Sequence, residues 1–295
     1  MVAVPTIALN NGVEIPQLGF GVYQVKPEET AQAVQTALEV GYRHIDTAEM
    51  YGNEKGVGEA IARSGIDRGE IFVTSKLNNG FHRRDDALRA FDRTLADLGF
   101  DQLDLFLIHW PLPGIDVDFV ETWKAMEEIY HSGRAKSIGV SNFTAHHLRK
   151  LHGETEVVPA VNQIEVHPYF RQPALLAADA EHGVLSQAWS PIGGITFYRD
   201  GEHTSTLEDP TIAGIAEAHG KSPAQVMLRW HLQQGRSAIP KSANPKRIAE
   251  NIAIVDFQLT GDELAAIDAL DTGKRGGPEA SAVNMETFGF PIPEA

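Results

Sequence analysis

The sequence predicts an α/β protein in which eight parallel strands close into a (β/α)8 (TIM) barrel. Short apolar runs rich in Val, Ile and Leu alternate with longer amphipathic segments, an alternation typical of parallel sheets covered by helices. The runs are nearly continuously apolar, as expected for strands that are buried on both faces. Eight such units occur in 295 residues, and single barrels of about 250 residues are common. We therefore expect one domain over residues 1–295.

An N-terminal hairpin is expected before the first unit. Its two runs, TIALN and VEIPQLG, meet at Asn10-Asn11-Gly12, where the Asn-Gly pair favours a type I′ turn. Apolar runs bounded by turn residues then predict the barrel strands at 18–23, 44–48, 71–77, 103–110, 137–143, 160–166, 185–191 and 237–242.

Amphipathic segments between and after the strands predict helices at 28–40, 53–64, 84–98, 117–132, 144–152, 173–182, 210–233 and 245–254. Side chains that can cap the first backbone amides lie near four of these starts, namely Asn53, Asp85, Thr144 and Asn244. Two other stretches are longer than connections need to be: 193–209 and a glycine-rich tail from Thr272. We expect both to cover a ligand, the tail forming a long C-terminal loop.

A doubly wound open sheet is the alternative fold, because it also alternates strands and helices. Its usual GxGxxG turn is missing after the first barrel strand, where Gly19-Phe20-Gly21 is followed by Val22-Tyr23-Gln24. The closed barrel is therefore the preferred prediction.

The composition narrows the class of function. Forty acidic against 25 basic residues give a net charge of −15, which repels nucleic acids and anionic membranes. The absence of cysteine excludes disulfides, thiolate metal sites and cysteine nucleophiles. No HExxH motif or clustered triad suggests a metal site, and no apolar run or leader suggests a membrane or secreted protein. We expect a cytoplasmic monomer that binds a small molecule.

Polar residues end most of the predicted barrel strands. Because the carboxyl ends of parallel barrel strands converge on one opening, we expect these side chains to meet there. Polar groups at such positions are unexpected if the strands serve only as scaffold. They include Asp46, Lys76, His109, Ser141, Asn142, Gln163, Trp189 with Ser190, and Lys241 with Ser242.

Four of the residues near these ends suit proton transfer to a carbonyl oxygen. The phenol of Tyr51 has an ordinary pKa of about 10, and a nearby ammonium such as Lys76 favours the phenolate. At ~4 Å and an effective dielectric of about 20, that attraction is roughly 4 kcal/mol before desolvation. We expect Lys76 to acidify Tyr51, Asp46 to hold Lys76, and His109 to donate a hydrogen bond to the carbonyl oxygen.

Each of the four also has a structural interpretation. Asp46 and Lys76 could form a simple ion pair, His109 could be a core histidine, and Tyr51 could be a surface tyrosine. Packing does not require all four at the same end of three successive strands, so the set favours a catalytic site.

Several motifs carry a resemblance to a known family. They are Asp46-Thr47-Ala48, Tyr51-Gly52-Asn53-Glu54, Thr74-Ser75-Lys76, Ile108-His109-Trp110-Pro111, Gly139-Val140-Ser141-Asn142-Phe143, Asn162-Gln163 and Ile239-Pro240-Lys241-Ser242. In this order and spacing they resemble the aldo-keto reductases, within which the chain is most similar to the bacterial branch of 2,5-diketo-D-gluconate reductases and prostaglandin F synthase-like reductases. The resemblance implies NADPH-dependent reduction of aldehydes or ketones, such as keto-sugar acids and dicarbonyls, with Tyr51 as general acid.

The resemblance also implies a cofactor site. Ser141, Asn142 and Gln163 would bind the nicotinamide carboxamide, and Trp189 would stack on the ring. The residues implied for the rest of NADPH are Lys241, Ser242 and Arg247 at the 2′-phosphate, with the amides of the helix beginning near Asn244; Glu250 and Asn251 at the adenine; and Ser190 and the loop from Ile192 at the pyrophosphate. Relatives often carry Arg where this chain has Asn244, a departure that bears on the preference for NADP over NAD.

The substrate wall is expected to include Phe20, Tyr23, Asn78 and Trp110. Two other functions remain open: a nicotinamide-binding regulatory subunit without turnover, and a hydrolase that uses paired carboxylates such as Asp46 and Glu165.

Overall fold

The computed structural model describes residues 4–193 and 205–288. Within them, parallel strands form an eight-stranded sheet in which neighbours follow chain order. The strands are β3 (Phe20–Gly21), β4 (His44–Asp46), β5 (Phe72–Leu77), β6 (Leu103–Ile108), β7 (Ala135–Ser141), β8 (Val161–Glu165), β9 (Leu185–Trp189) and β10 (Ser237–Ile239). The first and last strands join because the amides of Gly19 and Gly21 donate to Ala238 O (2.9 Å) and Pro240 O (3.0 Å). The predicted closed barrel is confirmed.

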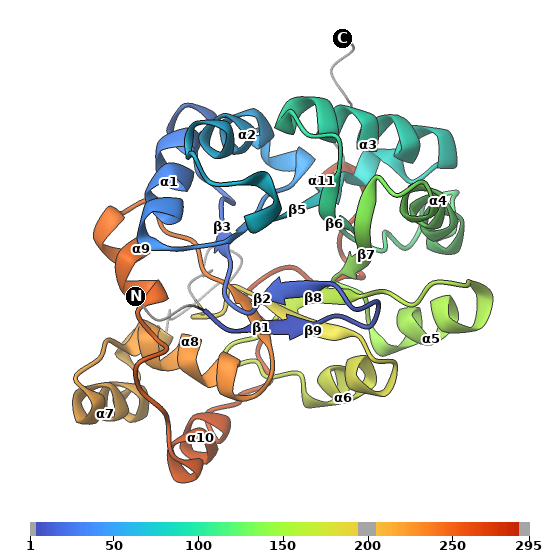
Figure 1. Cartoon of the computed structure of the whole chain (residues 1–295). Coiled ribbons are helices and arrows are strands. Elements are labelled where there is room, and N and C mark those ends of the chain that lie inside the picture. The colour runs from blue at the N-terminus through green and yellow to red at the C-terminus, as the bar shows by residue number, and fades with distance from the viewer. Residues whose placement is uncertain (1–3, 194–204, 289–295) are drawn as a thin grey trace.

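The predicted hairpin is also present and covers the amino-terminal end of the barrel, crossing the front of Figure 1. Its strands are β1 (Thr6–Ala8) and β2 (Glu14–Pro16). The predicted turn type is wrong: Gly12 has φ 84°, but Asn11 does not have the positive φ that a type I′ turn needs. The side-chain amides of Asn10 and Asn11 instead donate to the backbone carbonyls of Pro159 and Lys136, which ties the turn to the barrel.

Helices surround the barrel (Figure 1). Their bounds are α1 (Pro27–Val40), α2 (Glu54–Arg63), α3 (Arg84–Leu98), α4 (Phe119–His131), α5 (Ala145–Glu154), α6 (Pro173–Glu181), α7 (Pro210–His219), α8 (Pro223–Gln233), α9 (Pro245–Ile252), α10 (Gly261–Asp268) and α11 (Met285–Phe288). The prediction of one helix over 210–233 is wrong. Gly220 ends α7 in the left-handed conformation (φ 61°), and Ser222 caps α8 just before Pro223.

Two of the four predicted helix caps are confirmed. Thr144 and Asn244 each accept hydrogen bonds from backbone amides of the first turn. Asn53 precedes α2 but does not cap it, because its side-chain oxygen accepts from Thr47 Oγ1 (2.9 Å) and its amide donates to loop carbonyls. Asp85 is not a cap either, since it lies inside the first turn of α3.

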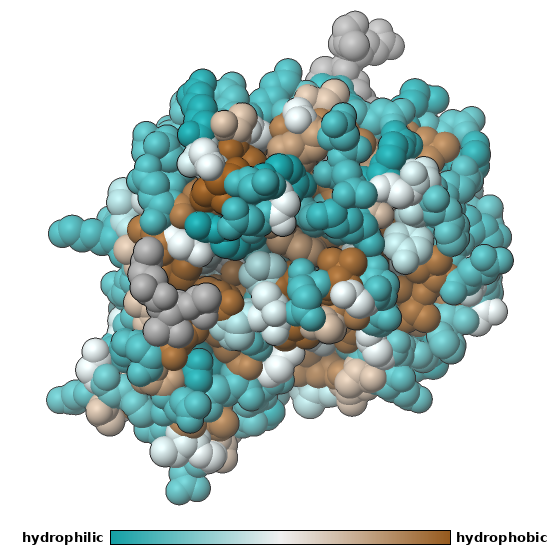
Figure 2. Space-filling model, viewed as in Figure 1, coloured by the Kyte–Doolittle hydropathy of each residue, from teal (hydrophilic) through white to brown (hydrophobic). Residues whose placement is uncertain are grey.

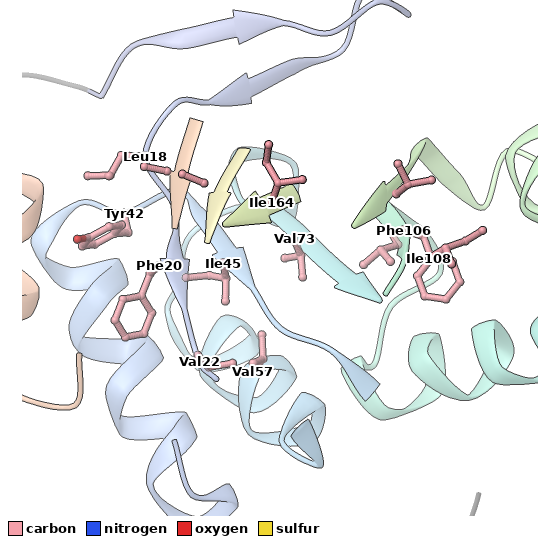
Figure 3. Close-up of a cluster of buried hydrophobic side chains, with 14 of the residues drawn as sticks. Leu18, Phe20, Val22, Tyr42, Ile45, Val57, Val73, Phe106, Ile108 and Ile164 are labelled. Carbon is pink, nitrogen blue, oxygen red and sulfur yellow. The ribbon is translucent and has the colours of Figure 1, made fainter. Parts of the chain in front are cut away.

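Successive strand residues alternate between the helix layer and the barrel interior. Ile45 and Val73 belong to the buried cluster between strands and helices that Figure 3 shows, together with Tyr42 of the segment after α1. Their neighbours Asp46 and Thr74 are buried on the other face of the sheet. This alternation positions Asp46, Lys76 and other polar strand ends inside the barrel.

The outer surface is what the amphipathic pattern predicts. Figure 2 shows hydrophilic residues over most of the outer helices and hydrophobic residues between them. Among residues 4–193 and 205–288, no helix has both the length and the apolar character needed to cross a membrane. The tail after α10 is a long loop over 269–284 before the short helix α11, as expected, whereas residues 194–204 of the other long segment lie outside the described residues.

Candidate active site

A cavity of about 350 Å³ opens at the carboxyl ends of the strands. Most of the residues predicted from the strand ends line it: Asp46, Tyr51, His109, Ser141, Asn142, Gln163, Trp189, Ser190, Ile192 and Lys241, with Tyr23 and Trp110 of the expected substrate wall. Side chains that the sequence did not single out also line it, including Gln24 and Met50, and Pro278 lines it from the tail that was expected to cover a ligand. The structure therefore brings together residues from seven of the eight barrel strands or the loops that follow them.

Lys76 lies directly beneath this cavity and is completely buried. Its ammonium donates to Asp46 Oδ1 (2.6 Å) and to the carbonyl of Thr47 (2.8 Å). The nitrogen is 5.2 Å from the ring centre of Tyr51. Burial lowers the pKa of Lys76, and the charge of Asp46 opposes that shift. Asp46 therefore holds the ammonium in position, as expected, and opposes its loss of charge.

Tyr51 ends a 3-10 turn, Glu49–Tyr51, that follows β4. Its ring packs against Tyr23 (centroids 5.1 Å apart) and edge-on against His109 (5.8 Å). These two rings hold the phenol over the cavity, close to Lys76.

The pKa of Tyr51 is raised well above its usual value of 10 by burial first, and then by the charges of Asp46 and Tyr23. This upward shift is opposite to the effect expected of the ammonium of Lys76, an expectation that did not include burial of the phenol. Burial of the phenol is the main reason, and Asp46, 2.6 Å from the ammonium, adds to it by offsetting the ammonium's field and disfavouring phenolate. Tyr51 consequently holds its proton at neutral pH, which a proton donor requires.

His109 is neutral in this environment. Burial, and secondly the charge of Lys76, lower its pKa well below 6.5. A neutral imidazole has one N–H to donate. Its Nδ1 has no hydrogen-bond partner among the described residues, while its backbone carbonyl accepts from Asn142 Nδ2 (3.0 Å). The ring is thus held in place with hydrogen-bonding capacity to spare.

Side-chain amides on β8 and β9 and just after β7 form a hydrogen-bond network that reaches Asp46 and Trp189. Gln163 Nε2 donates to Asp46 Oδ2 (2.7 Å) and to Gln187 Oε1 (2.7 Å). Asn142, in the left-handed conformation (φ 63°), accepts from Trp189 Nε1 (2.9 Å) and so orients the indole. Sequence reasoning missed Gln187, although its place two residues before Trp189 on the same strand face was a usable signal.

Lys241 and Arg247 form a compact basic group outside β10. Arg247 Nε donates to Ser242 Oγ (3.4 Å), and neither cation makes an ion pair with a described residue. Burial, and then the charge of Arg247, lower the pKa of Lys241. Two neighbouring cations beside a hydroxyl fit an anion such as phosphate. The amides of Lys246 and Arg247, expected to help hold the anion, are already bonded to Asn244 Oδ1.

Several predicted site residues do not line the cavity. Phe20 is fully buried in the core beside Tyr42 (centroids 5.6 Å apart), on the helix side of β3 (Figure 3). Asn78 is buried next to Glu49, to which its side chain is hydrogen bonded. The structure corrects the expectation that these two residues form the substrate wall, because their side chains pack away from the opening. Four further predicted cofactor residues lie on or just before α9, beyond the cavity lining: Ser242, Arg247, Glu250 and Asn251.

A buried acid behind the site makes stability depend on pH. Burial raises the pKa of Glu54 to about 8, although Ser75 Oγ donates to it (2.5 Å). Because this folded pKa exceeds the unfolded value, the native state binds more protons, and stability falls as pH rises from about 5 to about 8. Replacing Glu54 with Gln should flatten that fall by at most about 1.4 kcal/mol per pH unit. Urea unfolding of the wild type and of Glu54→Gln between about pH 5 and pH 8 tests this prediction. An equal dependence of the unfolding free energy on pH in the two proteins would contradict it.

The comparisons with known proteins agree with this geometry. The aldo/keto reductase family model matches residues 17–272. The chain is 51% identical over 288 residues to morphine 6-dehydrogenase of Pseudomonas putida, covering 96% of this chain and 97% of that one. It is 47% identical over 280 residues to methylglyoxal reductase DkgA of Escherichia coli K12, covering 94% and 98%.

Solved structures show the same likeness. The crystal structure of an aldo/keto reductase from Brucella melitensis has a TM-score of 0.85 and 50% identity, covering 91% of this chain and 100% of that one. An aldo-keto reductase of Bombyx mori in complex with NADP has a TM-score of 0.89 and 39% identity, covering 94% and 96%. The chain therefore belongs to the aldo/keto reductase family, whose members are oxidoreductases.

Proposed function

We propose that this protein reduces the carbonyl group of small aldehydes and ketones to an alcohol, using NADPH, with Tyr51 as the proton donor. One observation carries the proposal: a protonated phenol lines a cavity between a buried Lys76–Asp46 pair and a neutral His109. Each of these groups has a defined use in carbonyl reduction, and they are within reach of one small molecule.

NADP(H) is the cofactor of this family, and the residues of this chain fit it. Trp189 offers an aromatic face at the cavity, with the polar side chains of Asn142 and Gln163 beside it. Lys241 and Arg247 would hold a phosphate group of the cofactor. When bound, the reduced nicotinamide supplies the hydride.

The protein's own groups would complete the reaction at oxygen. Negative charge develops on the carbonyl oxygen, and the N–H of His109 stabilises that charge. Tyr51 then donates its proton to the same oxygen. The ammonium of Lys76, 5.2 Å from the phenol ring, stabilises the phenolate that remains. Lys76 therefore acts during proton transfer, when charge appears on Tyr51, rather than by acidifying the resting phenol.

Small dicarbonyl compounds are the proposed first substrates, with keto-sugar acids second. The 47% identity to an enzyme named methylglyoxal reductase supports this choice. The test is loss of NADPH absorbance with methylglyoxal and a panel of other aldehydes and ketones. Absence of turnover despite NADPH binding would favour the regulatory-subunit alternative.

The hydrolase alternative is not supported by the placement of its two carboxylates. Asp46 is bonded to Lys76 and Gln163, and Glu165 accepts the amides of Gly276 and Gly277. Both carboxylates are buried and fully engaged, so neither is available to attack or protonate a glycoside.

Replacing Arg247 with Ala should weaken NADPH binding by about 10- to 100-fold and leave NADH binding nearly unchanged, because the 2′-phosphate distinguishes the two cofactors. The KM values of both cofactors measure this effect. Lys246→Ala is the matched control, since Lys246 is the exposed cation one residue earlier on α9. Equal losses for NADPH and NADH would place the phosphate elsewhere.

The single domain over residues 1–295, the monomeric state and the cytoplasmic location stay predictions of the sequence.

A further inference from the structure

A buried carboxylate at the edge of the cavity holds the C-terminal tail. Glu165 is the last residue of β8 and is 1% exposed. Its oxygens accept the amide of Gly276 (2.6 Å) and the amide of Gly277 (3.0 Å), and His167 Nε2 lies 3.0 Å away. Burial raises the pKa of Glu165. His167 and the two glycine amides together lower this pKa by more than burial raises it, so the net shift is downward. The carboxylate is thus compensated by His167, by the two glycine amides and by the guanidinium of Arg275, whose Nη1 lies 3.5 Å from Glu165 Oε2, and the amides and the guanidinium belong to the tail.

The same tail segment touches the indole of Trp189. A Cβ added to Gly277 would lie 2.3 Å from Trp189 Cη2, so only glycine allows the contact as it stands. The opposite end of the indole is held by its hydrogen bond to Asn142 Oδ1. Gly277 does not have a positive φ, so its role is to leave space rather than to adopt a special conformation. The indole is therefore fixed at two points, one of them on the tail.

From this point the tail crosses the cavity opening. Pro278, the residue after Gly277, lines the cavity. Farther along, Val283 is buried against Trp110 and Leu112, which follow β6. The tail is therefore attached on the β8 side by Glu165 and on the β6 side by apolar contact.

We infer that Glu165 is a positioning residue that holds segment 275–278 against Trp189 and in the cavity wall, and thereby sets the affinity for both the carbonyl substrate and the nicotinamide cofactor. The inference rests on the proposed function and adds a residue to it. Glu165 itself does not touch the reacting atoms. Its effect passes through the glycine backbone to the indole and to Pro278.

The first test is Glu165→Gln. The side-chain amide replaces one acceptor oxygen with an NH₂ group that faces backbone N–H donors, so the tail should detach. We expect the KM of the carbonyl substrate to rise about tenfold while kcat changes less than about threefold. The dissociation constant of NADPH, measured by quenching of protein fluorescence without substrate, should rise at least about fivefold.

The matched control is Asp179→Asn, the same chemical change at another fully buried carboxylate. Asp179 accepts from Asn162 Nδ2 (3.0 Å) and Ser186 Oγ (2.6 Å) and is not bonded to the tail. Asp179→Asn should therefore lower only the stability of the protein: its Tm should fall, while the KM of the carbonyl substrate and the dissociation constant of NADPH stay unchanged.

A second variant tests the contact without altering the carboxylate. Gly277→Ala keeps the amide that Glu165 binds; its added Cβ would lie 2.3 Å from Trp189 Cη2 and 3.3 Å from Glu165 Oε2, so it pushes mainly on the indole. This variant should raise the dissociation constant of NADPH at least about fivefold, with little change in Tm. Gly214→Ala, where an added Cβ meets nothing within 4 Å, should behave as wild type.

The outcomes separate this inference from the proposed function. If Glu165→Gln and Gly277→Ala both keep the NADPH dissociation constant within about twofold of wild type, the inference is overturned, whether or not a substrate has been found. If the wild-type protein turns over no carbonyl compound, the proposed function fails, and the NADPH measurements still decide the role of Glu165.

Discussion

Replacing Tyr51 with Phe is expected to lower the turnover of carbonyl substrates by about 10²- to 10⁴-fold, the range that general acid catalysis contributes. The phenol is the protonated group that lines the cavity beside the Lys76–Asp46 pair, and its ring packs against His109. Phe keeps the ring and its packing, so only the proton donor is lost. The measurement is kcat with saturating NADPH, together with the NADPH dissociation constant, which should change less than about twofold.

Tyr42→Phe is the matched control for this experiment. Tyr42 is also a buried tyrosine, but its hydroxyl has no hydrogen-bond partner among the described residues and lies in the core shown in Figure 3. Removing a buried hydroxyl without a partner should leave turnover unchanged and stability equal or slightly higher. Turnover by Tyr51→Phe close to that of wild type would mean that another group protonates the substrate, and the proposed mechanism would fail.

The fold could be predicted because its signals are local and repeated. Each apolar run such as 103–110 is long enough to indicate a buried strand, and a helix-like segment follows each of the eight runs. The errors in the predicted helices and turns came from single residues whose local effect outweighs the pattern of apolar and polar residues. Gly220 and Ser222 divide the expected helix 210–233, and the turn at Asn11 follows the hydrogen bonds that its side chain makes to the barrel.

The site could be predicted as far as strand position determines it. A residue at the carboxyl end of a barrel strand faces either the interior or the helices, and the apolar pattern alone does not say which. Phe20 therefore seemed equivalent to Tyr23 in the sequence, yet it packs against Tyr42 in the core while Tyr23 lines the cavity. The net pKa of Tyr51 could not be predicted either, because it depends on the distance between Asp46 and Lys76 and on burial of the phenol.

Contacts between segments that are distant in the sequence were the hardest feature to predict. Glu165 and Gly277 are separated by more than a hundred residues, and only the folded barrel shows that one binds the other. The sequence offered Glu165 as a possible partner of Asp46 in hydrolysis, but its carboxylate is occupied by the tail. Chemical type alone thus suggested a reactive acid where the structure has a structural anchor for the cavity wall.

Replacing Lys76 with Met should destabilise the protein by about 3–5 kcal/mol at pH 7, the usual effect of removing one member of a buried ion pair. Lys76 is completely buried and Asp46 is 3% exposed, so the remaining carboxylate has little access to water. Among the described residues it keeps one side-chain donor, Gln163 Nε2 at 2.7 Å. Urea unfolding measures the loss. Lys136→Met is the matched control, because Lys136 is half-exposed and its partner Asp104 is also paired with Arg68; it should cost under about 1 kcal/mol.

The loss in Lys76→Met should also depend on Asp46. The double variant Lys76→Met with Asp46→Asn should recover most of the loss at pH 7, because no buried charge remains. If the double variant is no more stable than Lys76→Met, the cost lies in lost packing of the lysine stem, and Asp46 is not held in its charged form by Lys76.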